Sequence, residues 1–356
     1  MAMQHDGSAE GLSGDGMLRL HRRQLVKGAA AAVLLAPFAG AAASARPTKT
    51  APPEPKTLVE GLAFPEGLFT LPDGSFGCVE IAAATLVRFA PDGRRTSSVA
   101  VGGGPNGAAV GPDGNIYLAN DGGLSFAKTN GVYSITGVPQ SYVSGSVQKV
   151  DRKTGAVSTL YDRVGDHMLK GPNDLCFADS KGFWFTDTGK IHNGVQDKGG
   201  LYWAAIDGSD IRQVAYPLES PNGIALSPDR KTLYVALSNG RQIMAYPIAG
   251  PGTLDAQGGR VIATVPGNLI LDNIAVEQSG NIVIATVIKG GLMTIDPKGK
   301  VLDFLPLPDM AVTAVAFGGP GHKTLFATLS TTGRIVAIPW PRPGLPSLFG
   351  RRAIKP

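Results

Sequence analysis

Short apolar runs alternate with glycine-containing turns along most of the chain. In one unit, Pro221-Asn222-Gly223 leads into an apolar run, a Pro-Asp turn follows, and residues 233–236 return as a second apolar strand. Two short strands around a tight turn are typical of a β-hairpin. The pattern occurs six times, and its units begin at 64–68, 105–110, 172–177, 221–226, 271–276 and, more weakly, 312–317.

The spacing of these units predicts the architecture. Five intervals separate position 66 from position 313, so the mean period is about 49 residues. A third strand usually follows each hairpin, as at 200–203. Six units of three or four antiparallel strands predict an all-β fold, a six-bladed β-propeller. The interval from 106 to 173 is longer than the others, which predicts an inserted loop or small lid within 121–140.

Composition and charge narrow the picture. Hydrophobic residues make up 43% of the chain and charged residues 17%, a balance that excludes a disordered chain. The 48 Gly and 27 Pro argue against a helical bundle. The net charge of +5 comes from dispersed residues, so we expect a mildly basic surface and no nucleic-acid partner. Cys78 and Cys176 lie in apolar runs, which favours two buried thiols over a disulfide.

The N-terminal segment has the pattern of an export signal. Arg22-Arg23 precedes an apolar stretch at 28–42, which ends in Ala43-Ser44-Ala45, a small-x-small cleavage site. This arrangement resembles a bacterial twin-arginine (Tat) signal. The expected partner is therefore the Tat export machinery, and the expected location is periplasmic or secreted, without stable membrane insertion after cleavage. The alternative is an uncleaved N-terminal anchor.

These patterns divide the chain into four predicted segments. They are a twin-arginine-type signal peptide at 1–45, a linker at 46–57, the propeller at 58–340 and a Pro-rich C-terminal tail at 341–356.

One position in every unit carries an oxygen-bearing side chain. The innermost strand of each propeller blade lines the central channel, so equivalent positions meet around one axis. In chain order this polar ring consists of Glu66, Asn106, Asn173, Asn222, Asp272 and Thr313. Carboxylates and amides without Cys or His suit a hard cation, Ca²⁺ first, with another divalent cation such as Zn²⁺ or Mg²⁺ as an alternative. A single Pro-Asn-Gly is a common turn signal, but its recurrence in register favours a metal site.

The same motifs resemble those of the regucalcin/gluconolactonase (senescence-marker-protein-like) family of calcium-dependent six-bladed propellers, related in fold to diisopropyl fluorophosphatase. The resemblance covers residues 58–340 and rests on Glu66-Gly67, Asn173-Asp174, Pro221-Asn222-Gly223 and Leu271-Asp272-Asn273, with Leu and Asn where the family's last motif has Pro and Gly. It implies that the metal is held by Glu66, Asn173, Asn222 and Asp272.

The resemblance also implies a catalytic role for Asp272, either as a general base or as a nucleophile; the sequence leaves both open. Asn106 is the candidate for holding a substrate oxygen, and His192 is a candidate substrate contact, with simple surface exposure as the alternative. Asp187 is a candidate for either a supporting partner of the site or a turn cap. Asn120 and Asp121 end a strand in a similar way and are further candidates for the pocket.

The expected function is that of an exported, calcium-dependent hydrolase, a gluconolactonase-like enzyme that opens a sugar lactone. Its expected partner is therefore a small-molecule substrate. Two alternatives stay open: an organophosphate or ester hydrolase that uses the same site, and a non-catalytic ligand-binding propeller. The fold by itself does not separate them.

Overall fold

The structure is a computed structural model that describes residues 54–192 and 194–349. The predicted signal at 1–45 and most of the predicted linker lie outside the described residues. Among the residues that are described, no helix is long and apolar enough to cross a membrane.

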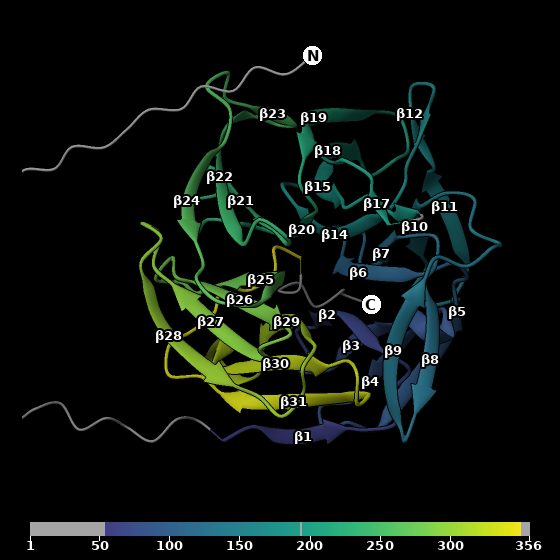
Figure 1. The fold of residues 1–356 in the computed structure, drawn as a ribbon, viewed down its shortest axis with the longest axis vertical. Coiled ribbons are helices and arrows are strands. Elements are labelled where there is room, and N and C mark those ends of the chain that lie inside the picture. The colour runs from purple at the N-terminus through teal and green to yellow at the C-terminus, as the bar shows by residue number, and fades with distance from the viewer. Residues whose placement is uncertain (1–53, 193, 350–356) are drawn as a thin grey trace, which may run out of the picture. The chain divides into compact units, whose positions relative to one another are not determined.

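Six antiparallel sheets form the blades of a β-propeller and confirm the predicted fold class (Figure 1). The innermost strands of neighbouring blades contact one another around the whole ring. Blades 1 to 3 consist of β2 (Pro65–Thr70), β3 (Phe76–Glu80), β4 (Thr85–Phe89) and β5 (Arg95–Ala100); β6 (Pro105–Val110), β7 (Ile116–Asn120), β10 (Ser146–Val150) and β11 (Val157–Tyr161); and β14 (Pro172–Phe177), β15 (Gly182–Asp187), β18 (Gly199–Ala205) and β19 (Ile211–Leu218).

The remaining blades repeat this order. Blades 4 to 6 consist of β20 (Pro221–Leu226), β21 (Thr232–Leu237), β22 (Gln242–Gly250) and β24 (Arg260–Thr264), with β23 (Thr253–Leu254) beside β22; β25 (Ile270–Val276), β26 (Ile282–Val287), β27 (Gly291–Ile295) and β28 (Val301–Pro306); and β29 (Val312–Gly318), β30 (Thr324–Leu329), β31 (Arg334–Pro339) and β1 (Lys56–Val59). Two short 3-10 helices, η1 (Ile81–Ala83) and η2 (Pro320–His322), occupy turns.

Strand β1 closes the propeller, because the first strand of the fold pairs with the last. Lys56 pairs with Ala337 and Thr57 with Val336. The predicted linker therefore extends two residues too far. The Pro-rich composition of this segment favours a linker, and the strand has no hairpin partner nearby in the sequence that would indicate it.

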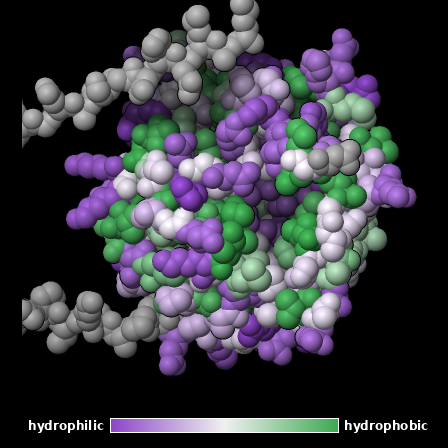
Figure 2. All heavy atoms as spheres, in the orientation of Figure 1, coloured by the Kyte–Doolittle hydropathy of each residue, from purple (hydrophilic) through white to green (hydrophobic). Residues whose placement is uncertain are grey.

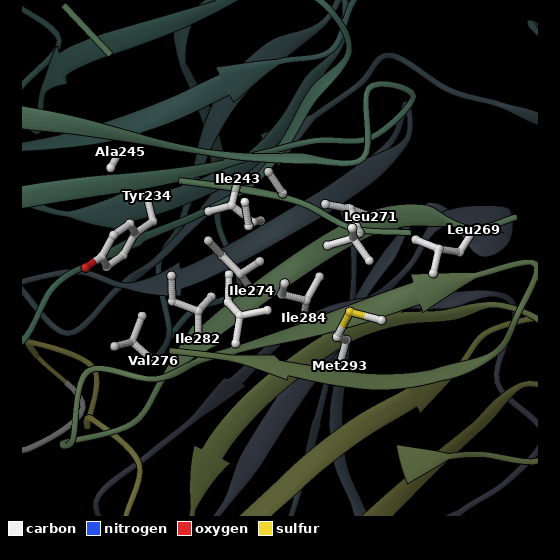
Figure 3. Packing of buried hydrophobic residues seen from close by; sticks show 14 residues of the cluster. Tyr234, Ile243, Ala245, Leu269, Leu271, Ile274, Val276, Ile282, Ile284 and Met293 are labelled. Carbon is white, nitrogen blue, oxygen red and sulfur yellow. The ribbon is translucent and has the colours of Figure 1, made fainter. Parts of the chain in front are cut away.

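The hydrophobic core is divided among the six junctions between blades. Each junction contains one cluster of buried residues. Between blades 4 and 5, Ile243 packs with Leu271, Ile274, Ile284 and Met293 (Figure 3). On the outer surface, hydrophilic and hydrophobic side chains are interspersed over the face that Figure 2 presents.

The long insertion in blade 2 is an ordered ribbon. Strands β8 (Ser125–Thr129) and β9 (Val132–Gly137) pair with each other. The ring of Phe126 lies 5.0 Å from that of Phe64, and the amide of Tyr133 donates to the carbonyl of Thr331 at 2.8 Å. The ribbon thus reaches the start of blade 1 and the turn between β30 and β31 in blade 6. Two further ribbons are β12 (Arg163–Val164) with β13 (His167–Met168), and β16 (Ile191–His192) with β17 (Val195–Gln196).

The described part of the predicted tail, 341–349, packs against the propeller. The amide of Leu345 donates to the carbonyl of Val276 at 2.8 Å, and the ring of Phe349 lies 5.6 Å from that of Phe177. Trp340 Nε1 donates to Glu277 Oε1 at 2.7 Å. The segment therefore spans from blade 5 to blade 3 and belongs to the propeller domain.

Candidate functional site

A β-bulge marks the start of every innermost strand. The strand register shifts between Glu66 and Phe69 in blade 1, and the other five blades shift at the corresponding place. A bulge re-aims side chains and is frequent beside active sites. The ring residues occupy these bulges, all at one end of the channel.

Three junctions around the polar ring are closed by glycines. A Cβ added to Gly107 would lie 2.5 Å from the carbonyl oxygen of Asn173, and one added to Gly223 would lie 2.6 Å from that of Asp272. Gly67 approaches the carbonyl of Asn106 in the same way. These backbones come so close because the glycines lack side chains. Glycine at these places therefore reflects close packing between blades.

Hydrogen bonds link the other three junctions. Thr186 Oγ1 in blade 3 donates to the carbonyl of Asn222 at 2.6 Å. The amide of Val315 donates to Asn273 Oδ1 at 3.0 Å and joins blade 6 to blade 5. Ser330 Oγ donates to the carbonyl of Pro65 at 2.6 Å, which joins blade 6 to blade 1. The six ring positions predicted from the sequence are thus brought to one end of the channel by a continuous set of contacts.

The ring brings two carboxylates together, Glu66 buried and Asp272 half-buried. Burial raises the pKa of Glu66 well above its ordinary value, and the charges of Asp272 and Asp174 raise it further, while a hydrogen bond from Thr313 opposes the shift. Burial likewise raises the pKa of Asp272 to about 7; a hydrogen bond from Asn222 lowers it, and the charge of Asp174 adds to the rise. Burial and mutual repulsion make the charged forms of these two carboxylates unfavourable, and a bound cation would offset that free-energy cost.

The side-chain amide of Asn222 also favours a bound cation at the ring. Its Oδ1 is buried and accepts no hydrogen bond. A buried amide oxygen without a partner costs free energy unless a donor or a cation satisfies it. With the carboxylates of Glu66 and Asp272, this oxygen makes a hard, oxygen-only donor set of the kind that calcium prefers. The residues present therefore fit a divalent cation, although the described residues contain no cluster of three or more His, Cys, Asp or Glu in metal-binding geometry.

The two predicted substrate contacts lie in different places. Asn106 belongs to the ring and is half-buried in β6. His192 is exposed on the β16–β17 ribbon, where its ring lies 5.7 Å from that of Tyr142. Tyr142 in turn lies beneath Lys190, whose Nζ is 5.3 Å from the centre of the tyrosine ring. His192 thus belongs to a group of residues outside the ring.

The strand-end candidates hold loops in place. Asp187 accepts hydrogen bonds from the backbone amides of Lys170, Gly171 and Gly189 at 2.7 to 2.8 Å, which makes it an anchor of two loops. Asn120 accepts from the amide of Gly104 at 2.8 Å and donates to Gln148 at 2.9 Å.

Lys190 is a buried cation that the sequence reading missed. Its side chain is 3% exposed, and Nζ lies 3.0 Å from Asp121 Oδ1 and donates to the carbonyl of Gly123 at 2.9 Å. The ion pair ties the loop after β15 to the loop after β7. Because the two residues are 69 positions apart in the sequence, no local motif signals their contact.

Below the ring the channel widens into a cavity of about 400 Å³. Asp174 and Asn273 line it on the side of the ring, and Leu345 and Leu348 line it from the C-terminal segment. Cys176 also lines it; this thiol is half-buried, Cys78 is fully buried, and neither forms a disulfide.

Fold and site together define a class: a six-bladed propeller with a ring of acidic and amide side chains at one end of its channel. Residues 64–331 match the model of the family described as SMP-30/Gluconolactonase/LRE-like region, and the chain belongs to this family.

Named relatives agree with this assignment. A gluconolactonase from Zymomonas mobilis is 27% identical over 246 residues, which are 64% of this chain and 61% of the relative, so the match spans less than two thirds of that protein. A 6-deoxy-6-sulfogluconolactonase from Pseudomonas putida is 28% identical over 57% of this chain and 82% of the relative. The structure of a calcium-binding protein, regucalcin, from Agrobacterium tumefaciens superposes with a TM-score of 0.69 at 18% identity, over 85% of this chain and 98% of that one, a likeness of fold.

Proposed function

We propose that this protein is a divalent-cation-dependent hydrolase that opens a lactone, most simply a sugar lactone of the gluconolactone type. The observation that carries the proposal is the meeting of Glu66, Asp272 and the unpaired Oδ1 of Asn222 at one end of the channel. Relatives named as gluconolactonase, 6-deoxy-6-sulfogluconolactonase and lactonase support a hydrolase of cyclic esters. The neighbour titled as calcium-binding regucalcin supports a divalent cation, for which we propose Ca²⁺.

Each ring residue has a proposed role. Glu66, Asn173, Asn222 and Asp272 hold the cation, which when bound supplies electrophilic polarisation of the lactone carbonyl. Asp272 is half-buried, so its carboxylate is accessible to an attacking water and is suited to take a proton from it. The water oxygen adds to the carbonyl carbon, the ring C–O bond breaks, and the released alkoxide regains a proton to give the hydroxy acid. Asn106 lies in β6, next to the strand that carries Glu66, and orients a substrate oxygen. His192 contacts the substrate from the exposed β16–β17 ribbon.

The N-terminal segment belongs to the proposal as well. Arg22-Arg23 and the cleavage pattern at 43–45 support export through the Tat machinery to the periplasm or beyond, where the mature chain meets its small-molecule substrate. Replacing both arginines with lysine tests this directly. We expect the precursor to accumulate in the cytoplasm, whereas unchanged export would contradict the proposal.

The catalytic proposal is tested by hydrolysis of a panel containing sugar lactones, simple aliphatic lactones, a carboxylic ester and a phosphotriester. The assays are run with and without chelator, for the wild type, Asp272→Ala and Asp207→Ala. Asp207 is a matched control because it lies in an exposed turn, where its carboxylate accepts from Ser209. We expect lactone opening that is lost with chelator and in Asp272→Ala alone. Activity that resists both changes would refute the proposed site, and turnover confined to the phosphotriester would refute the proposed substrate.

A further inference from the structure

The residue that directly follows each ring residue also faces a neighbouring blade. In chain order these second positions are Gly67, Gly107, Asp174, Gly223, Asn273 and Ala314. Four of the six are glycine or alanine, and the glycines are in close contact with the next strand. Only Asp174 and Asn273 carry polar side chains, and those two side chains bond to each other: Asn273 Nδ2 donates to Asp174 Oδ2 at 2.8 Å.

Each of these side chains also receives a backbone amide from the following blade. Asp174 Oδ2 accepts from the amide of Ile224 at 3.1 Å, and Asn273 Oδ1 accepts from the amide of Val315 at 3.0 Å. Ile224 and Val315 occupy equivalent places, each two residues after a ring residue. The same contact is therefore used twice, between blades 3 and 4 and between blades 5 and 6. The bond between Asp174 and Asn273 joins the two contacts across blade 4.

We infer that Asp174 and Asn273 are positioning residues: they form a bridge under the ring that sets the spacing of Asn173, Asn222 and Asp272. The inference rests on the proposed function, because the spacing matters for the cation and lactone assigned to the ring. Asp174 is only 6% exposed and its other oxygen accepts from the amide of Leu175 at 2.8 Å. Both oxygens of Asp174, and Oδ1 and one N–H of Asn273, are thus bound to neighbouring residues.

The bridge links strands that no hairpin connects. Asp174 and Asn273 are 99 residues apart, and their hydrogen bonds join β14, β20, β25 and β29. Three of the four residues proposed to hold the cation, Asn173, Asn222 and Asp272, lie on the first three of these strands. A change in the bridge should therefore move the oxygen atoms of these residues relative to one another without removing any of them.

Four variants separate positioning from general stability. Asp174→Asn replaces the acceptor that faces the Asn273 amide with a second donor. Asn273→Gly removes the side chain and introduces the residue that three other second positions carry. The double exchange Asp174→Asn with Asn273→Asp returns one donor opposite one acceptor and keeps the net charge. Thr70→Val is the matched control, because Thr70 Oγ1 donates to the carbonyl of Phe317 at 2.8 Å and joins the innermost strands of blades 1 and 6 beside the cavity below the ring.

Two readouts are measured on the full mature chain: side-chain amide NMR resonances of Asn173 and Asn222 without added metal, and the Kd for Ca²⁺ by calorimetry. We expect both bridge variants to shift these resonances and to weaken Ca²⁺ binding by tenfold or more. The double exchange should recover part of the affinity, and Thr70→Val should alter neither readout. If Asp174→Asn does not fold, Asn273→Gly carries the test.

The inference is overturned if the resonances of Asn173 and Asn222 stay at their wild-type positions in the folded bridge variants, or if Thr70→Val shifts them equally. Failure of the wild type to bind Ca²⁺ would refute the proposed cation. The metal-free NMR comparison would still decide whether the bridge positions the ring, so the two failures are distinguishable.

Discussion

Replacing Gly223 with alanine should damage the ring through packing alone. The new Cβ would lie 2.6 Å from the carbonyl oxygen of Asp272 and 2.7 Å from Cα of Asn273, both of them backbone atoms. An ordinary contact begins near 3.4 Å, so blades 4 and 5 must separate by about 0.8 Å at this point. Overpacking of this kind costs about 1–3 kcal/mol of unfolding free energy. A displacement near 1 Å in a catalytic site costs up to about 10²-fold in rate.

Gly250→Ala is the matched control, because Gly250 also lies in a strand of blade 4 but has no atom within 4 Å of the added Cβ. Thermal unfolding and lactone hydrolysis are measured for both variants. We expect Gly223→Ala to lower Tm by about 2–4 °C for each kcal/mol of unfolding free energy that is lost. We also expect kcat/KM to fall by about 10- to 100-fold. Gly250→Ala should remain near the wild type in both. Equal behaviour of the two variants would refute the close packing of the ring.

Three further predictions concern charge. Asp272→Asn should lower kcat by about 10²- to 10⁴-fold, yet leave the Tm of the chelated protein equal or higher, because it removes a repulsion with Glu66; a lower Tm in scanning calorimetry would contradict this. Calcium at about 100 times its Kd should stabilise the chelated wild type by about 2.7 kcal/mol, whereas an unchanged Tm on calcium addition would count against a cation site. Burial raises the pKa of Glu277, but hydrogen bonds from Arg342, Trp340 and two other residues outweigh it and hold the pKa below the ordinary value of 4.5. Its stabilisation is therefore complete above pH 4.5 and lost as pH falls through the lower folded pKa. Glu277→Gln should cost about 1–3 kcal/mol at pH 7 and flatten the acid limb of the stability curve, and an unchanged acid limb in urea titrations would contradict the assignment.

The polar ring was predictable because each repeat carries one oxygen-bearing side chain at the equivalent position. A period of about 49 residues and a short polar element before each apolar run were enough to bring Glu66 and Asp272 to the same axis. Every innermost strand of a propeller runs in the same direction along the channel, so equivalent positions meet at the same end of it. The fold class followed from the same repeat.

Contacts between blades were not predictable in the same way. Asp174 and Asn273 are neighbours of ring residues, but their bond depends on the bulges that aim both side chains under the ring. The buried pair of Lys190 and Asp121 depends on how two loops meet. Strand β1 pairs with residues about 280 positions away, and the C-terminal segment contacts Val276 and Phe177, which are 69 and 172 positions from their partners Leu345 and Phe349. Neither contact leaves a local periodicity to recognise.

The most direct test of the central claim is a crystal structure of the mature protein grown with calcium, with the ion located by anomalous scattering. We predict one ion at the ring, with oxygen atoms of Glu66, Asn173, Asn222 and Asp272 at about 2.3–2.6 Å from it. A ring that contains only water at calcium concentrations that support full activity would contradict the account.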